Sequence, residues 1–242
     1  MRRPEAAAWA ALERDVVACE LCPRLRAWCR RVAAERVRRF AGERYWGRPV
    51  PGFGDPAARL WIVGLAPAAH GGNRTGRVFT GDRSGDFLFA ALHRAGIASQ
   101  PGSTARGDGL ALAGAWISPI VRCAPPANRP APEEVAACRP YLVREALLLA
   151  PRLAAVLALG GAAHGGWLAA WAGASGRPLP RPRPRFAHGA AHDLGGGLRL
   201  FDAYHPSQQN TFTGRLTPAM MDEVLAAVAV HLRASRAAPP VG

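Results

Sequence analysis

The sequence contains no lysine, because all 31 of its basic residues are arginines. A chain rich in Ala, Gly and Pro that lacks lysine can reflect a GC-rich genome, so the choice of arginine carries little functional information. The shortage of acidic residues carries more, because 17 acids leave a formal net charge of +14 on 242 residues. Such a field attracts polyanions, with nucleic acid first and an anionic membrane surface second.

Long apolar runs are also missing. A membrane span needs roughly 18–20 apolar residues, and the longest run, Leu153–Leu159, has only the length of a buried strand. Residues 1–15 carry acids where a signal peptide has its apolar core, so we expect no membrane association and a cytoplasmic location. The hydrophobic content of 49% argues against a disordered chain.

Cysteine is scarce, and its number is odd. The five cysteines are Cys19, Cys22, Cys29, Cys123 and Cys138. In a chain without an export sequence, this pattern fits metal ligation better than disulfides.

Short apolar segments alternate with helical ones along the chain. We expect strands at 59–65, 116–121, 153–159 and 198–204. The expected helices cover 5–40 with a break at Cys19–Pro23, 84–95 capped by Ser84, 132–149, a segment after Gly161, and 218–233. The alternation predicts an α/β fold of three αβα layers around a four-stranded parallel sheet. We expect one domain over 1–236, a surface excursion at 173–197 and a frayed tail at 237–242.

Ligands of such sheets bind beyond the carboxyl ends of the strands. The loops that follow the four strands are 66–85, 122–132, 160–166 and 205–215, and they are rich in polar residues, Gly and Pro. We therefore look for the site in these loops.

Two cysteine pairs lie about 100 residues apart. Cys19-x2-Cys22 presents two thiolates in one turn, which suits zinc or an iron–sulfur cluster. Cys123 and Cys138 are more widely spaced than the second pair of a zinc ribbon, which favours a [4Fe–4S] cluster that ties the N-terminal helices to the sheet. Cys29 is expected to be a buried small side chain. The alternative is that the cysteines are unliganded core thiols.

The loop sequences carry long motifs: GLAPAAHGGNRTGR at 64–77, followed by Phe79 and Asp82, and HPSQQNT at 205–211. With the four cysteines, they resemble the uracil-DNA glycosylase superfamily, and most closely its iron–sulfur family 5 (type b). The resemblance implies hydrolysis of the N-glycosidic bond of a damaged base that is flipped out of double-stranded DNA. It also implies a structural [4Fe–4S] cluster on Cys19, Cys22, Cys123 and Cys138. We further expect a monomer that associates with the nucleoid when bound to DNA, and no lysine-based covalent step.

The motifs imply a role for each of several loop residues. Phe79 matches the aromatic that stacks on the flipped base, and the alternative is a core side chain. His205 matches a neutral imidazole that stabilises charge on a pyrimidine oxygen, and the alternative is a structural histidine. Asp82 matches the carboxylate that positions or activates water, and the alternative is an acid at a helix N-terminus. Asn128 is a third catalytic candidate, or else a turn residue between prolines.

Other residues are expected around the pocket and on the DNA. The further base-pocket residues are Gly64, Ala68, His70 and Asn73, and the DNA contacts are Arg74, Arg77, Arg215, Gln209 and Asn210. Arg83, Arg122 and Arg129 also suit phosphate contacts. Gln208, Gln209 and Phe212 are candidates to fill the gap that the flipped nucleotide leaves.

The pocket departs from other branches of the superfamily. The loop 64–69 offers no Asp, Glu or Asn, and Pro119 stands where family 4 enzymes carry a uracil-reading Asn. Because rejection comes mainly from unpaired polar groups, we expect a broad range that includes hypoxanthine. The rival hypotheses are a non-catalytic DNA-binding module and a zinc-stabilised nucleic-acid adaptor.

Overall fold

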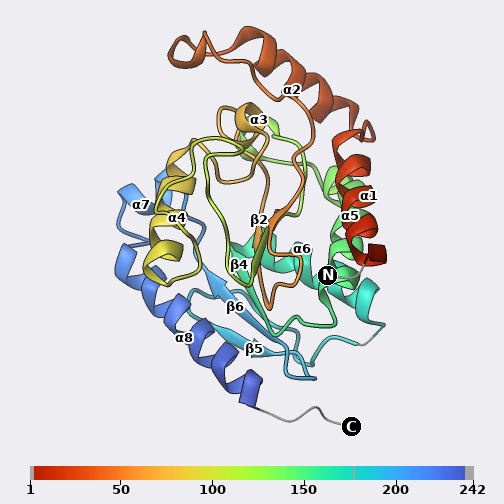
Figure 1. The fold of residues 1–242 in the computed structure, drawn as a ribbon, viewed down its shortest axis with the longest axis vertical. Helices are drawn as coiled ribbons and strands as arrows, with labels where there is room; N and C mark the ends of the chain where they lie inside the picture. Colours follow the sequence, from red (N-terminus) through yellow and green to blue (C-terminus); the bar gives the residue numbers. More distant parts are fainter. Residues whose placement is uncertain (1–2, 177, 238–242) are drawn as a thin grey trace.

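A six-stranded sheet forms the centre of the computed structural model, which describes residues 3–176 and 178–237 (Figure 1). The strand order is β1-β3-β2-β4-β6-β5. Four inner strands are parallel, as predicted: β3 (Ala115–Pro119), β2 (Leu60–Gly64), β4 (Ala155–Leu159) and β6 (Arg199–Ala203). Two short antiparallel strands, β1 (Phe53–Gly54) and β5 (Ala191–Asp193), were not predicted and close the two edges. They lie in Gly- and Pro-rich stretches, β5 within the expected surface excursion, where no alternation of apolar residues marks a strand.

The long helices lie close to where the sequence places them. The helix bounds are α1 Arg3–Val17, α2 Pro23–Glu35, α3 Gly72–Thr75, α4 Arg83–Arg94, α5 Pro132–Leu149, α6 Gly161–Ser175, α7 Gln208–Phe212 and α8 Pro218–Ala237, with 3₁₀ turns at Arg38–Phe40 and Pro126–Asn128. However, α2 ends at Glu35 instead of residue 40, and the short α3 and α7 lie in segments predicted as loops. Pro23 and Pro132 open their helices, where a missing N–H has no cost. The N-cap of α4 is Asp82 and not Ser84, because the Asp82 carboxylate accepts from the Gly85 N–H at 2.9 Å.

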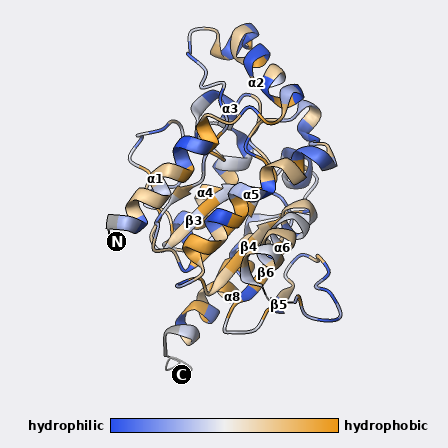
Figure 2. Cartoon of the chain, turned by 90° about the vertical axis from the view of Figure 1, so that its right-hand side faces the viewer, coloured by the Kyte–Doolittle hydropathy of each residue, from blue (hydrophilic) through white to orange (hydrophobic). Residues whose placement is uncertain are grey.

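Alternate residues of the strands face two apolar layers. Trp61 and Val156 belong to the layer covered by α5 and α6, whereas Ile62 and Leu157 belong to the layer covered by α4 and α8. In Figure 2 the apolar colour is concentrated on the strands and on the helix faces turned toward them. The three-layer αβα prediction is therefore confirmed.

The N-terminal helices wrap around the outside of this sandwich (Figure 1). Helix α1 packs on α5, and Trp9 meets Trp116 with ring centroids 4.3 Å apart. No helix in the described ranges is long and apolar enough to span a membrane. The tail expected to fray lies, apart from Ala237, outside the described residues.

Candidate active site

The four loops predicted to form the site all start at the same end of the sheet. The Ile120 N–H donates to the Gly64 carbonyl at 2.9 Å, so the ends of β3 and β2 are in register. The Gly160 N–H donates to the Ala203 carbonyl at 2.8 Å, which joins the ends of β4 and β6 in the same way. All four loops therefore start at the carboxyl ends of parallel strands, where such sheets bind ligands.

Phe79 lies over the end of β2 in a strained backbone conformation. Its φ is +51°, which is uncommon for a residue with a large side chain. Two glycines make this possible: a Cβ on Gly64 would lie 2.8 Å from the Phe79 ring, and a Cβ on Gly85 would lie 1.9 Å from the Phe79 carbonyl oxygen. The ring is only 8% exposed and packs with the α4 layer, so Phe79 is a core side chain that also borders the site.

His205 follows β6 and meets Phe79. The two ring centroids are 5.9 Å apart with an interplanar angle of 35°. The amide of Asn210, a predicted DNA contact, donates to the His205 carbonyl at 2.8 Å and so orders its own loop. Burial lowers the pKa of His205 from 6.5 to about 4. At neutral pH the ring is therefore an uncharged imidazole with one N–H to donate.

Asp82 caps a helix, which is the structural role that the sequence analysis gave as its alternative. Its Oδ1 caps α4, while a Cβ on Gly71 would lie 1.9 Å from its Oδ2. Burial raises the pKa of Asp82 above the ordinary value, and the charge of nearby Asp86 raises it further. A carboxyl group in such surroundings is suited to exchange a proton.

His70 is linked to a tyrosine that the sequence did not reveal. The Tyr45 hydroxyl and His70 Nδ1 are 3.0 Å apart, and Tyr45 is buried. The backbone of Ala68 accepts from the N–H groups of Gly71 and Asn73, which folds the loop into α3. Tyr45 lies in the Gly- and Pro-rich stretch 45–56. The one signal in the sequence that could have marked it as a site residue is an aromatic side chain among turn residues.

Three of the predicted contact residues lie inside the protein instead. Asn73 is fully buried and donates to the Cys29 carbonyl at 3.3 Å, so its side chain is not on the pocket surface. Arg74 is 8% exposed and bonds to Glu43, to the His70 carbonyl and to the Gly81 carbonyl.

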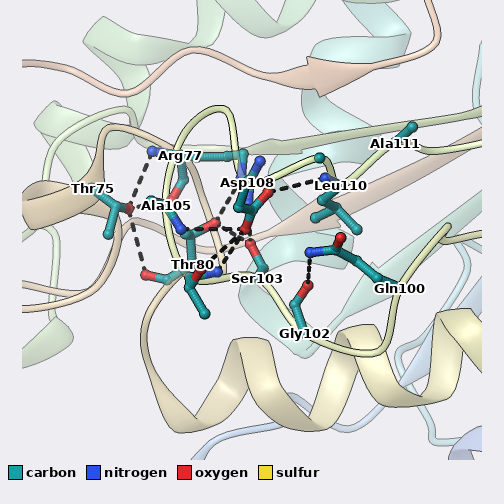
Figure 3. A network of polar contacts seen from close by, with 12 residues as sticks. Thr75, Arg77, Thr80, Gln100, Gly102, Ser103, Ala105, Asp108, Leu110 and Ala111 are labelled. Atoms are coloured by element: carbon teal, nitrogen blue, oxygen red, sulfur yellow. Dashed lines mark hydrogen bonds and ion pairs between the residues drawn. The ribbon is translucent and has the colours of Figure 1, made fainter.

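Arg77 is 7% exposed and pairs with Asp108 at 2.6 Å, with further bonds to Thr80 and Ser103 (Figure 3). This network pins the loop of the first motif to the segment before β3. The two arginines therefore act as internal partners and are not free for phosphates. The sequence could not show this, since Asp108 lies 31 residues further along.

Several other predicted DNA contacts are at the surface. Gln209 is exposed on α7, and Phe212 at the end of that helix is 72% exposed. The exposed Arg215 places its guanidinium 4.6 Å from the centroid of the Tyr204 ring, next to His205. Asn128 lies in an exposed 3₁₀ turn with φ +56°. This position matches the alternative prediction for Asn128, that of a turn residue.

A positively charged hollow adjoins Asp82. Its volume is about 720 Å³, and its border includes four exposed arginines, Arg39, Arg44, Arg83 and Arg106. Three of them were not among the predicted DNA contacts, because they come from segments outside the motif loops.

Four of the five thiols converge beside the sheet. Cys19 and Cys22 bracket the turn between α1 and α2, Cys123 follows β3, and Cys138 lies in α5. Burial, together with the charges of Cys19 and Cys22, raises the pKa of Cys138 to about 11. A hydrogen bond to Cys29, burial and the charge of Cys138 raise the pKa of Cys123. Cys29 is fully buried, as predicted.

The spacing of these thiols does not match a single tetrahedral zinc ion. Zinc–sulfur bonds of about 2.3 Å place the sulfurs of a tetrahedral site about 3.8 Å apart. Among the described residues, no three cysteine sulfurs lie within 4.8 Å of one another.

A buried cation accompanies the cysteines. The backbone N–H of Arg122 donates to the Cys138 sulfur at 3.3 Å. The charge of the Arg122 guanidinium lowers the pKa of Cys138. Arg122 is paired with buried Glu145 at 2.5 Å, and its Nε and Nη1 have no hydrogen-bond partner among the described residues. This arginine was expected on the DNA. Its guanidinium supplies unused donors and positive charge near Cys138, which fits an anionic cluster.

Comparison with known proteins agrees with this arrangement. A profile described as the uracil DNA glycosylase superfamily matches residues 51–229. The chain belongs to the uracil-DNA glycosylase superfamily. A type-5 uracil-DNA glycosylase from Mycobacterium bovis is 54% identical over 208 residues, which cover 85% of this chain and 75% of the relative. The type-5 enzyme from Thermus thermophilus is 50% identical over 215 residues, 89% of this chain and 94% of its own length.

Within the superfamily, the type-5 relatives resemble this chain more than the type-4 ones do. A type-4 uracil-DNA glycosylase from Pyrobaculum aerophilum is 39% identical over 118 residues, 48% of this chain and 52% of the relative. The segment that matches the superfamily contains Phe79, Asp82, His205 and two of the four converging cysteines. The predicted membership in the type-5 branch is confirmed.

Proposed function

We propose that this chain is a monofunctional DNA glycosylase that removes uracil from DNA and so begins base excision repair. The observation that carries the proposal is the meeting of Phe79 and His205, from the loops after β2 and β6, with ring centroids 5.9 Å apart. Asp82, a carboxyl whose pKa is raised by burial, comes from the same loop as Phe79. An aromatic ring, a neutral donor and a carboxyl group are the three elements that such a reaction needs.

In the reaction, the bond between C1′ of the sugar and the base breaks, and its electron pair goes to the base. The N–H of neutral His205 stabilises the charge that develops on a carbonyl oxygen of the base. Asp82 stabilises the positive sugar, takes a proton from the attacking water, and passes it to the released base. The products are the free base and an abasic site with an intact backbone.

The substrate range extends to other deaminated bases, including hypoxanthine. Residues Leu65–Ala69 carry no side-chain amide or carboxylate, and Pro119 ends β3 without a side-chain donor or acceptor. A pocket without a bidentate amide leaves no polar partner unpaired when a different base enters, so it discriminates weakly.

The DNA is double-stranded, and α7 contacts it at the flipped nucleotide. Phe212 is 72% exposed at the tip of a short helix that starts two residues after Pro206, beside Gln209. An exposed ring in this place is suited to insert between base steps. The four arginines around the hollow next to Asp82 supply phosphate contacts.

The cofactor is a structural [4Fe–4S] cluster on Cys19, Cys22, Cys123 and Cys138. When bound, the cluster supplies a rigid link between the turn before α2, the loop after β3 and α5. The pairing of a CxxC turn with two more distant cysteines, a sulfur spacing that does not match one zinc ion, and the unused donors of Arg122 support it. Visible absorbance with about four irons per chain is the expected result, and a colourless protein with one zinc contradicts it.

An excision assay on labelled duplexes containing uracil, hypoxanthine, xanthine, a thymine mismatch or etheno-cytosine tests the proposal. We expect alkali-labile sites with uracil and hypoxanthine. If excess protein yields none with either base, the chain is a non-catalytic DNA-binding module instead.

The Asp82→Asn variant tests the role of the carboxylate. Asn caps helices about as well as Asp, so the fold keeps its cap while the carboxylate is lost. Turnover should fall by about 10²–10⁴-fold with DNA affinity retained. Glu133→Gln, an exposed acid in the first turn of α5, is the matched control and should change turnover little. Equal losses of turnover and binding in Asp82→Asn would make the residue structural.

The Phe212→Ala variant tests the wedge. Excision of uracil from a duplex should fall, whereas excision from the same oligonucleotide as a single strand should not, because there the base needs no unstacking from a partner strand. An equal effect on both substrates would remove Phe212 from this role.

A further inference from the structure

Two histidines and an aspartate meet behind the strand that leads to His205. His164 comes from α6, His192 from edge strand β5, and Asp202 from β6, three residues before His205. Asp202 is fully buried, His164 is 4% exposed, and the His192 side chain is 20% exposed. The glycosylase reaction proposed above uses none of the three.

Their ligand atoms are arranged as around a metal ion. His164 Nδ1 lies 2.8 Å from Asp202 Oδ1, and His192 Nε2 lies 3.2 Å from Asp202 Oδ2. The three groups offer ligand atoms that all lie within 4.8 Å of one another. Metal–nitrogen and metal–oxygen bonds of about 2.0–2.2 Å in a tetrahedron separate neighbouring ligands by about 3.3–3.6 Å. The two nitrogen–oxygen spacings need only a small expansion to reach this geometry, and the histidine nitrogens lie within 4.8 Å of each other.

Both ring nitrogens of His164 face hydrogen-bond acceptors, which favours a positive charge in the cluster. Its Nε2 lies 3.1 Å from the Pro184 carbonyl oxygen, and its Nδ1 faces a carboxylate oxygen. A neutral imidazole has one N–H, so in either tautomer one ring nitrogen presents a lone pair to another acceptor. A second proton or a metal ion removes the conflict. The Nε2–H bond to a backbone carbonyl is also how metal-bound histidines are held in protein sites.

We propose that His164, His192 and Asp202 bind a divalent transition-metal ion of the zinc type. Two imidazoles and a carboxylate form a donor set that zinc accepts, and the partly exposed side of His192 leaves the fourth position to water. Asp202 supplies the negative charge that attracts the ion. The positive charge of Arg183, in the neighbouring loop, acts against ion binding.

The ion fastens the segment 183–193 to the end of β6. This segment already contacts the strand, since Ala187 N–H donates to Asp202 Oδ2 at 3.4 Å and the Gly189 N–H to the Asp202 carbonyl at 2.9 Å. The His188 ring stacks on Tyr204 with centroids 4.8 Å apart, directly before His205. The metal therefore holds the backbone that positions the proposed catalytic histidine.

Zinc binding to the purified protein with its native cofactor tests this inference. After zinc addition and gel filtration, we expect the wild type to retain one more zinc per chain than His192→Ala. Its melting temperature should also rise with zinc concentration, and that of the variant should not. Loss of a second-shell partner weakens metal binding about 10–100-fold, so loss of a ligand should weaken it at least that much. His93→Ala, an exposed histidine elsewhere, is the matched control.

A rescue variant separates ligation from folding. His192→Cys restores a ligand atom and should recover zinc binding, while His192→Ser should not. Equal zinc retention by wild type and His192→Ala would overturn the site and leave a proton as the cation on His164. Neither outcome depends on excision activity, so failure of the metal site and failure of the glycosylase proposal are distinguishable.

Discussion

Replacement of His205 by Asn should remove a pH dependence of stability whose size follows from the burial of the ring. Burial lowers the pKa of His205 from 6.5 in the unfolded chain to about 4 in the folded protein. Between these values the unfolded chain binds a proton that the folded protein does not. The contribution of His205 is therefore fully present above pH 6.5, is lost as the pH falls, and levels off below pH 4.

The expected magnitude is large enough to measure. A shift from 6.5 to about 4 corresponds to about 3 kcal/mol when complete and to about 2 kcal/mol at pH 5. Urea denaturation of the wild type and of His205→Asn, at pH 7.5 and pH 5, gives the difference between the two proteins at each pH. That difference should shift by about 2 kcal/mol in favour of the variant at pH 5.

The comparison between the two proteins cancels the contributions that are common to both. His93→Asn, at an exposed histidine, serves as the control and should show no comparable shift. If the difference between wild type and His205→Asn is the same at both pH values, the ring is not held neutral by burial. The role of His205 as an uncharged donor would then lose its physical basis.

Further predictions concern packing and the ion pair. Gly64→Ala places a Cβ 2.8 Å from the Phe79 ring, so excision should fall by about 10²-fold in a steady-state assay; Gly165→Ala, on an open part of α6, should not change it. Asp108→Asn leaves Arg77 buried without its anion and should lower the free energy of unfolding by about 3–5 kcal/mol in urea titrations. The Arg77 pair and three backbone N–H groups lower the pKa of Asp108, so stability should also fall as the pH drops below the ordinary range of Asp.

The sequence predicts the inner sheet and most helices well, because local pattern decides them. Helix α5 spans 132–149 in both the prediction and the structure, since a proline opens it and acids fill its first turn. The cap of α4 differs because Asp82 and Ser84 are both good caps. The close contact of Gly85 with the Phe79 carbonyl favours the start at Asp82.

The sequence predicts the site residues less well than the fold, because contacts between distant segments decide which side chains reach the surface. The motifs correctly bring Phe79 and His205 together. They also contain Arg77, whose partner Asp108 lies on a different loop. Local sequence does not distinguish a phosphate-binding arginine from one that is paired inside the protein. The cluster around Asp202 is hidden in the same way, because its members come from three separate segments.

The two edge strands bear on how copies of this protein meet one another. An open row of N–H and C=O groups on a sheet edge is a template for another chain. Here β1 has two residues and β5 has three, and Asp193 places a charge at the end of β5. Such edges offer little backbone for intermolecular pairing, so crowded copies along one stretch of polyanion have little tendency to join sheet to sheet. Short edges thus give this fold resistance to aggregation at high local concentration.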